Sequence, residues 1–393
     1  MSSIKLKHSG GNSVSIAAPA SNPTADRTVT LPSTDVDGVI TTKDSNDRLQ
    51  SVTGANGGQF ANRNIFINGE MQVAQRGTSV SGLTNSNGCQ AVDRMFCRLR
   101  GSVGTWTVSQ STDAPAGFGT SLKWDCTTAR TSPHATDDFA YIQQRIEGRN
   151  VQQLKKGTSE AEKITVSFYV KSNKTGNFAL RVNDADNSRS IGATYTINSA
   201  NTWERKTMTF AGDTSGTLDN DNNQSFNVLW WIVIGSGRTS GTLPTSWTNQ
   251  VTADEAVGQN VNMADSTDNE FLITGIQLEL GEVATDFEHR LFGRDLADCQ
   301  RYMYRVQDRM VGKAQNSADM YNPRLDHPVE MRASPTLSNG SFGTHSGSNG
   351  SPVIGNTRFV GGGGTLSVAL HNGSNNWSSG AWVKLTGDIS AEL

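Results

Sequence analysis

The chain has 393 residues, which predicts two or three domains, and its forty glycines with only 35% hydrophobic residues favour short strands and turns over helices. The net charge is −3 and no run of Lys or Arg occurs, so the basic surface typical of nucleic-acid binding is missing. No apolar stretch approaches the length of a membrane span, and the opening MSSIKLKHSGG lacks the apolar centre of a signal peptide. We therefore expect an all-β protein without nucleic-acid partners, membrane insertion or signal-peptide export.

Residues 1–60 form the first predicted unit, an extended β segment for attachment or oligomerisation. Short alternating pieces such as Ile4/Leu6 and Val14/Ile16 are interrupted by glycines and prolines, so the segment has too little apolar surface to fold alone. We expect it to pair with copies of itself or to dock onto another protein. A mobile tail is the alternative.

Residues 61–290 have the regular alternation of a β-sandwich. KITVSFYVKS is the clearest strand, because its apolar residues occupy every second position. NFALRV, ATYTIN, WERKTMTF and SFNVLWWIVIG repeat the pattern between Asn, Gly and Asp turns, and NIFINGEMQVAQRG predicts strands around an Asn-Gly turn. VLWWIVI is apolar on both faces, which predicts a central strand or a subunit contact. Eight or more strands without intervening helices favour a jelly roll.

Residues 271–306 connect two predicted bodies. The first half alternates as a strand and is interrupted at Gly281, after which the apolar residues recur about every 3.6 positions, at Phe292, Leu296, Cys299, Met303 and Val306. This period predicts an amphipathic linking helix over residues 291–310. Residues 311–393 then show short strands between Gly- and Ser-rich loops, which predicts a small β domain. Because such a piece has little core of its own, we expect it to trimerise.

Acidic pairs are the only candidates for catalysis: Asp137 with Asp138, Asp184 with Asp186, and Asp219 with Asp221. A glycosidase needs two carboxylates across the scissile bond. Each pair lies among turn residues, however, where Asp caps the backbone without any reaction. No GxSxG, HExxH, P-loop or GxGxxG motif occurs. We expect no catalytic residue and no enzymatic activity.

The cysteines and histidines do not predict a metal site or any other cofactor. The four cysteines, Cys89, Cys97, Cys126 and Cys299, are far apart and lack CxxC spacing, so we expect reduced thiols. His289 lies in FEHR at the predicted domain boundary, where a packing or hydrogen-bonding role is expected.

Tryptophan is the best candidate for contact with a sugar, whose flat C–H faces pack on aromatic rings. The tryptophans inside predicted alternating strands are expected in the core or at a subunit contact: Trp203, Trp230 and Trp231. Trp247 and Trp377 lie among Thr, Ser, Asn and Gly, where a glycan contact and loop packing both fit, and Trp382 begins a strand. We take these last three as candidate glycan-binding residues.

Several separated motifs carry a family resemblance. NIFINGEMQVAQRG with AVDRMFCR, YIQQRIEGRNVQQLKKGTSEAEKITVSFYVKS, and GIQLELGEVATDFEHRLFGRDLADCQRYMYR resemble tail-fibre and related virion appendage proteins of tailed bacteriophages, whose central domain resembles a carbohydrate-binding-module jelly roll. The opening SSIKLKHSGGNSVSI is similar to fibre proteins of marine phages, particularly cyanophages. The resemblance implies a virion tail protein assembled in the bacterial cytoplasm, attachment to other tail proteins through residues 1–60, a homotrimer, and a host-surface glycan as ligand.

The chain departs from that family at one site. Carbohydrate-binding jelly rolls often hold a structural calcium with a carboxylate shortly after the first Asn-Gly turn and an Asp before the closing strand. The corresponding positions are Gln72 or Val73, and Thr274 or Gly275, which supply no anionic oxygen. We do not expect calcium there.

Three functions are consistent with the sequence. The favoured one is a tail fibre or appendage that binds host glycans non-covalently and multiplies weak contacts by avidity. A purely structural virion component, such as an adaptor or head decoration, is the second. A polysaccharide depolymerase is the third, although the regular coils of a parallel β-helix are not seen.

Overall fold

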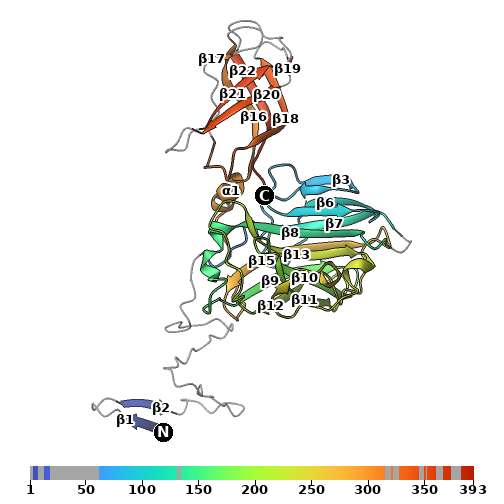
Figure 1. The fold of residues 1–393 in the computed structure, drawn as a ribbon, viewed down its shortest axis with the longest axis vertical. Coiled ribbons are helices and arrows are strands. Elements are labelled where there is room, and N and C mark those ends of the chain that lie inside the picture. Colours follow the sequence, from blue (N-terminus) through green and yellow to red (C-terminus); the bar gives the residue numbers. More distant parts are fainter. Residues whose placement is uncertain are drawn as a thin grey trace. The chain divides into compact units, whose positions relative to one another are not determined.

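The computed structural model describes residues 3–7, 13–17, 62–130, 134–314, 320–321, 327–344, 349–350, 352–359, 366–372 and 382–393. The chain divides into two compact units, Met1–Gly58 and Gln59–Leu393. In the first unit, β1 (Ser3–Lys7) and β2 (Ser13–Ala17) form an antiparallel pair (Figure 1). The rest of the predicted attachment segment lies outside the described residues, so its role stays a prediction.

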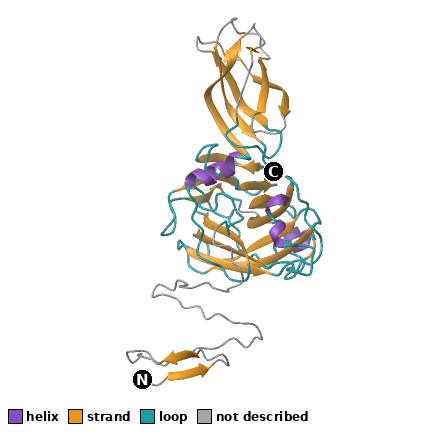
Figure 2. Ribbon diagram, turned by 90° about the vertical axis from the view of Figure 1, so that its left-hand side faces the viewer, coloured by secondary structure: helices purple, strands orange, loops and turns teal. Residues whose placement is uncertain are grey.

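Two antiparallel sheets form a β-sandwich in the second unit, and strands predominate throughout the described chain (Figure 2). The seven-stranded sheet has the order β14-β11-β10-β13-β8-β5-β4. Its strands are β4 (Asn87–Cys89), β5 (Phe96–Arg100), β8 (Phe139–Glu147), β10 (Gly176–Asp184), β11 (Arg189–Ile197), β13 (Gln224–Ile234) and β14 (Thr248–Asn249). The six-stranded sheet has the order β12-β9-β15-β7-β6-β3. Its strands are β3 (Ser79–Leu83), β6 (Thr105–Ser111), β7 (Ser121–Thr128), β9 (Ile164–Ser172), β12 (Glu204–Phe210) and β15 (Glu270–Leu280). The chain crosses repeatedly between the sheets, as in a jelly roll, and the all-β prediction is confirmed.

The inner faces of the two sheets enclose an aromatic and aliphatic core. Trp230 of β13 meets Phe168 of β9 edge-on, with ring centroids 5.6 Å apart, and both side chains are fully buried. Trp106 of β6 and Trp124 of β7, both in the six-stranded sheet, make a similar edge-on contact. Because β13 lies between β10 and β8, the prediction of a central strand from its two apolar faces is confirmed.

The segment 64–73 does not form the strands predicted around its Asn-Gly turn. Asn68 accepts a hydrogen bond from Val73 N and donates to Val73 O, each at 2.9 Å, so an amide side chain replaces a strand partner. Asn68 and Met71 also adopt left-handed φ values of 59° and 60°, which a strand excludes. The strand prediction was wrong here, although Phe66, Met71 and Val73 are buried in the core.

The linking helix is shorter than predicted. α1 (Phe292–Gln300) begins at the expected place, but Met303 and Val306 belong to β16 (Met303–Ala314), so the prediction of helix to residue 310 was wrong. Residues 303–306 form a strand instead of a helix because β22 (Trp382–Ser390) is an antiparallel partner for β16. Arg305 of β16 also donates a hydrogen bond to Asp388 of β22 at 2.8 Å. This partner is remote in sequence, so the local apolar period does not reveal it.

β16 and β22 belong to a five-stranded sheet with the order β17-β16-β22-β18-β19. The remaining strands of this region are β17 (Met320–Tyr321), β18 (Thr336–Thr344), β19 (Asn349–Gly350), β20 (Pro352–Phe359) and β21 (Leu366–Asn372). β20 and β21 pair with each other. The trimer predicted for this region stays a prediction.

The described residues contain no helix long and apolar enough to cross a membrane. All four cysteines are free, as their spacing predicts. Three of them are buried, and burial raises the pKa of Cys126 to about 11, so its thiol stays protonated at neutral pH.

A buried ammonium group joins three segments at one edge of the sandwich. Lys156 Nζ lies 2.5 Å from Asp184 Oδ2 and 2.9 Å from Asp213 Oδ2, and it donates to the carbonyls of Ser215 and Gly216 at 2.8 Å each. Burial alone would raise the pKa of Asp213, but hydrogen bonds from Arg189 and Lys156 outweigh it and lower that pKa. Lys156 therefore helps to neutralise the charge of two buried carboxylates, those of Asp184 and Asp213.

Substituting Lys156→Met is expected to lower the free energy of unfolding by about 3–5 kcal/mol, because Asp184 would lose its buried cation. Denaturant unfolding of the whole chain measures the loss. The control is Lys163→Met, whose side chain is 51% exposed beside Glu282 and whose removal should change stability by less than about 1 kcal/mol. Equal, small effects of the two substitutions would contradict this role.

Candidate ligand-binding groove

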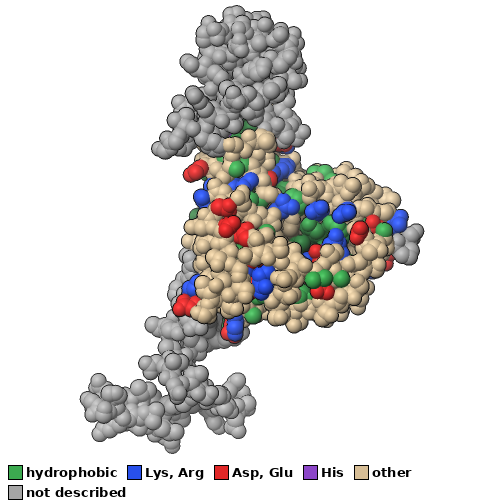
Figure 3. All heavy atoms as spheres, viewed as in Figure 1, with side chains coloured by type: hydrophobic (Ala, Val, Ile, Leu, Met, Phe, Trp, Pro, Cys, Tyr) green, Lys and Arg blue, Asp and Glu red, His purple; other side chains and the backbone are tan. Residues whose placement is uncertain are grey.

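A groove of about 410 Å³ lies on the seven-stranded sheet, on the face turned away from the core. We call it the sheet groove; it is lined by outward residues of β5, β8, β10 and β13 and by residues of the loop 235–255. Figure 3 shows a hollow with hydrophobic side chains inside and Lys and Arg side chains at its margin, where Figure 1 labels β8 and β13. Its volume is in the range of small-ligand sites.

Strand alternation decides which side chains line the groove. On β13, Val228 and Trp230 enter the core, while Asn227, Leu229 and Trp231 face the groove. Cross-strand register then aligns these residues with their neighbours on β5, β8 and β10. The rows are Arg98–Tyr141–Trp231, Gln143–Leu229–Arg181 and Arg145–Asn227–Asn183. Each row therefore contains one arginine among aromatic, aliphatic or amide side chains.

An aromatic cluster forms the floor at one end of the groove. Phe139 and Tyr141 stack with centroids 5.5 Å apart, and Trp231 meets Tyr141 edge-on at 5.1 Å. The three side chains are at most 8% exposed, and the guanidinium of Arg238 lies 4.3 Å from the Phe139 centroid. Because arginine already covers this cluster, it offers little open ring surface for a sugar to stack on.

Glu255 joins the loop to the sheet. Its carboxylate lies 2.7 Å from Nη1 of Arg181 on β10, and its other oxygen pairs with Arg238, at the end of η3 (Ser236–Arg238). Burial lowers the pKa of Arg181, while Glu255 opposes that shift, so the guanidinium stays charged. Glu255 is the only acidic side chain lining the groove among the residues that the structure describes.

Four buried polar atoms of the groove residues have no hydrogen-bond partner among the described residues. They are Nε of Arg181, Nε of Arg238, Nε1 of Trp231 and Oδ1 of Asn183. Leaving a buried polar atom unpaired costs about 1–3 kcal/mol, so each one needs an explanation. Three donors and one acceptor in one groove are what a polar ligand would satisfy.

The groove ends near the last residues of the chain. Arg145 stacks over Phe96 at 3.6 Å and donates from Nη1 to Leu393 O at 2.5 Å. The neighbouring Glu392 carboxylate lies 2.9 Å from Arg76 and 2.5 Å from Arg94. Although burial alone would raise the pKa of Glu392, these two arginines lower it, so the carboxylate remains charged. These contacts hold the segment 391–393 against the sandwich beside the groove.

The tryptophans proposed from the sequence do not gather in the groove. Trp247 donates from Nε1 to Ala211 O at 2.7 Å, and its ring packs on Phe226 with Lys156 Nζ 5.4 Å from its centroid. Trp377 lies outside the described residues, and the structure describes only the backbone of Trp382. Their contact with a glycan stays a prediction.

At least one member of each acidic pair, and His289, has a structural partner. Asp138 accepts a hydrogen bond from Ala135 N and Asp221 accepts one from Asn223 N, which are turn-capping roles. Asp138 also accepts a long-range hydrogen bond from Ser102 N. His289 Nδ1 lies 2.9 Å from Glu70 Oε1, so the predicted hydrogen-bonding role is confirmed. The described residues contain no group of three or more His, Cys, Asp or Glu placed to hold a metal.

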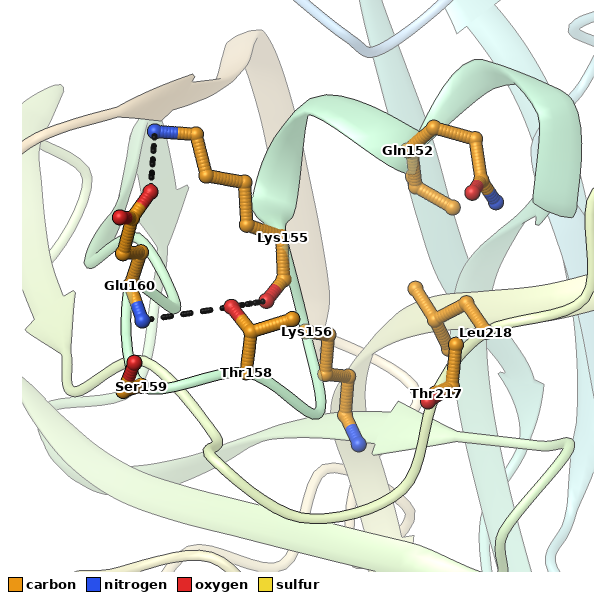
Figure 4. A pocket seen from close by; sticks show the side chains of 9 residues that line it. Gln152, Lys155, Lys156, Thr158, Ser159, Glu160, Thr217 and Leu218 are labelled. Atoms are coloured by element: carbon orange, nitrogen blue, oxygen red, sulfur yellow. Dashed lines mark hydrogen bonds and ion pairs between the residues drawn. The ribbon is translucent and has the colours of Figure 1, made fainter.

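A second, open depression of about 490 Å³ lies over residues 151–160 and 217–218 (Figure 4). Thr158 accepts from Glu160 N at 3.2 Å and donates to Lys155 O at 2.7 Å, and Lys156 is held by Asp184 and Asp213. No described residue lining it has a buried unpaired atom. The sheet groove is therefore the better candidate for a binding site.

The groove arginines were missed at the level of sequence. A usable signal exists in FCRLR and FAYIQQRIE, where Arg alternates with core residues and so belongs on the outer face. That signal is weak, because a charged residue on the outer face of a sheet usually just faces water.

No protein-family model matches the chain, and no curated protein matches it. Among solved structures, the enzymatically active domain of bacteriophage CBA120 tailspike protein 4 matches 56% of this chain at 12% identity with a TM-score of 0.28, and the match covers 22% of that chain. A family 11 carbohydrate-binding module from Clostridium thermocellum, in complex with a mixed-linked tetrasaccharide, matches 54% of this chain and 99% of its own, at 11% identity and a TM-score of 0.26. A xylan-binding CBM22 domain matches 53% and 98%, at 13% identity and a TM-score of 0.27. TM-scores this low carry no argument about function.

Substituting Glu255→Gln is expected to lower the free energy of unfolding by about 2–3 kcal/mol, because Arg181 and Arg238 would lose their shared anion. Glu282→Gln is the matched control: that carboxylate is 65% exposed beside Lys163, and its loss should matter by less than about 1 kcal/mol. Thermal and denaturant unfolding measure both. A stable Glu255→Gln variant would show that the pairing does not hold the loop.

Proposed function

We propose that this protein is a glycan-binding tail fibre or appendage of a bacteriophage virion, with the sheet groove as its binding site. Residues 1–60 would attach it to other tail proteins, and copies of the chain would form a homotrimer. The observation that carries the binding site is the groove with its four unpaired buried polar atoms. The virion role is supported by the sequence motifs that resemble tail fibres.

A glycan fits the groove because its hydroxyl groups both donate and accept hydrogen bonds. The free donors of Arg181, Arg238 and Trp231 require acceptors, and Oδ1 of Asn183 requires a donor. Amide side chains of Gln143 and Asn227 add further groups of both kinds. A purely apolar ligand would leave all of these atoms unpaired.

Binding without bond cleavage is the activity that the groove supports best. Glycoside hydrolysis needs two carboxyl groups with separate roles, whereas Glu255 is the only one lining the described groove and both its oxygens face arginines. We therefore propose a non-enzymatic function. Weak contacts from several copies on one particle would add up through avidity.

Substituting Ala185→Trp tests the groove. Ala185 is exposed and lines the groove, so an indole there should obstruct the ligand and weaken binding about tenfold or more without unfolding the sandwich. The measurement is binding of the full chain to a multivalent glycan array and to host cells, with the unfolding temperature as a check. Ala200→Trp, an exposed position away from the groove, is the control.

The same assay separates the other two functions. Absence of binding by the unsubstituted chain at every glycan density would favour a purely structural virion component. Release of reducing ends from a host polysaccharide would establish a depolymerase and contradict the proposal.

A further inference from the structure

The charge of the sheet groove is unbalanced. Five arginines line it, Arg98, Arg100, Arg145, Arg181 and Arg238, against the single carboxylate of Glu255. Both oxygens of Glu255 are already engaged by Arg181 and Arg238. The side chain of Arg98 has no hydrogen bond or ion pair within the described part of the chain, and its guanidinium lies 5.6 Å from the Phe139 centroid. The groove thus concentrates positive charge in a protein whose net charge is −3.

The unsatisfied donors of the groove are largely on these same groups. Nε of Arg181 and Nε of Arg238 are buried and unpaired, and a guanidinium can only donate. The atoms that meet them must be acceptors, and the fork of N–H groups on arginine matches a carboxylate or sulfate best. Burial also lowers the pKa of Arg181 and of Arg145, which shows that both cations are poorly solvated. An anion would relieve that desolvation.

An anion alone does not satisfy the site. Oδ1 of Asn183 is a buried acceptor that needs a hydroxyl or N–H donor, and it lies on the row that also holds Arg145 and Asn227. The ligand must therefore carry hydroxyl groups close to its charge. A nucleic acid is less suitable, because single-stranded binding depends on bases stacking on open aromatic faces and arginine covers the aromatic cluster here.

We propose that the sheet groove selects acidic glycans, whose sugars carry a carboxylate or sulfate group, over neutral glycans of the same shape. This rests on the proposed glycan-binding function and adds the chemical class of the ligand. The arginines would contact the anionic group, while the amides and Trp231 would contact ring hydroxyls.

Matched pairs of glycans test the selectivity on the full chain. An array would present uronic-acid oligosaccharides, including trigalacturonate, beside their methyl esters, and sulfated oligosaccharides beside their desulfated forms. We expect the acidic member of at least one pair to bind about tenfold or more tightly than its neutral partner, since charge-assisted hydrogen bonds contribute more than neutral ones. This preference should shrink as salt is added, because salt screens the exposed part of the groove.

Arg98→Gln is the decisive variant because no described hydrogen bond or ion pair depends on the side chain of Arg98. We expect it to weaken binding of the acidic member about tenfold and binding of the neutral member much less, because only the acidic member can form a charge-assisted pair with the guanidinium. Arg294→Gln removes the same charge from an exposed position on α1, outside the groove, and should leave both affinities unchanged.

Each outcome decides between the claims. Equal affinity for acidic and neutral members of every pair would overturn the selectivity but leave glycan binding in the groove intact. Binding to neither class would overturn the proposed function itself. Tighter binding of a single-stranded oligonucleotide would identify a nucleic-acid site instead. Equal losses from Arg98→Gln and Arg294→Gln would show a general charge effect without recognition in the groove.

Discussion

The sheet groove depends on the carboxylate of Glu255 between two arginines. Arg181 projects from the middle of a β-sheet, where an unpaired guanidinium would be costly to desolvate. Glu255 makes that position tolerable and, through Arg238, holds the loop 235–255 against the same sheet face. The loop buries the outer face further, and this burial converts an ordinary polar sheet surface into a site with unpaired donors. Removing water from the arginines thus creates both a cost for stability and a possibility for recognition.

The strands that pack on the core follow directly from the sequence. KITVSFYVKS and SFNVLWWIVIG form β9 and β13 because alternation, or apolar residues on both faces, leaves few other ways to bury their side chains. The two wrong elements share one cause, a partner that local pattern does not show. The Asn68 side chain accepts a hydrogen bond from the backbone of Val73, and β22, which is distant in sequence, pairs with Met303–Val306. Periodicity predicts burial better than it predicts which group completes the hydrogen bonds.

The groove was harder to predict because its residues converge only through register. Arg98, Arg145 and Arg181 lie on three strands, and they share one face because Tyr141, Leu229 and Asn227 pair across between them. The adjacent tryptophans also show that strand register, and not residue type, decides which side chains reach the groove. Trp230 and Trp231 look equivalent in sequence, yet a one-residue difference sends the first into the core and the second to the groove. Tryptophan was the ligand-binding candidate suggested by the sequence, whereas arginines outnumber carboxylates in the groove that the fold assembles.

Partly buried arginines suit a binder that must discriminate more than it must hold tightly. Pairing an anion with a partly desolvated guanidinium gains a charge-assisted hydrogen bond whose net contribution is modest, because both groups lose water. A neutral ligand lacks even that gain, and specificity is the difference between the two affinities. On a particle with many copies, weak but selective contacts allow firm attachment to the right surface and release from the wrong one. The strength of attachment would then come from copy number, and its selectivity from the arginines of each groove.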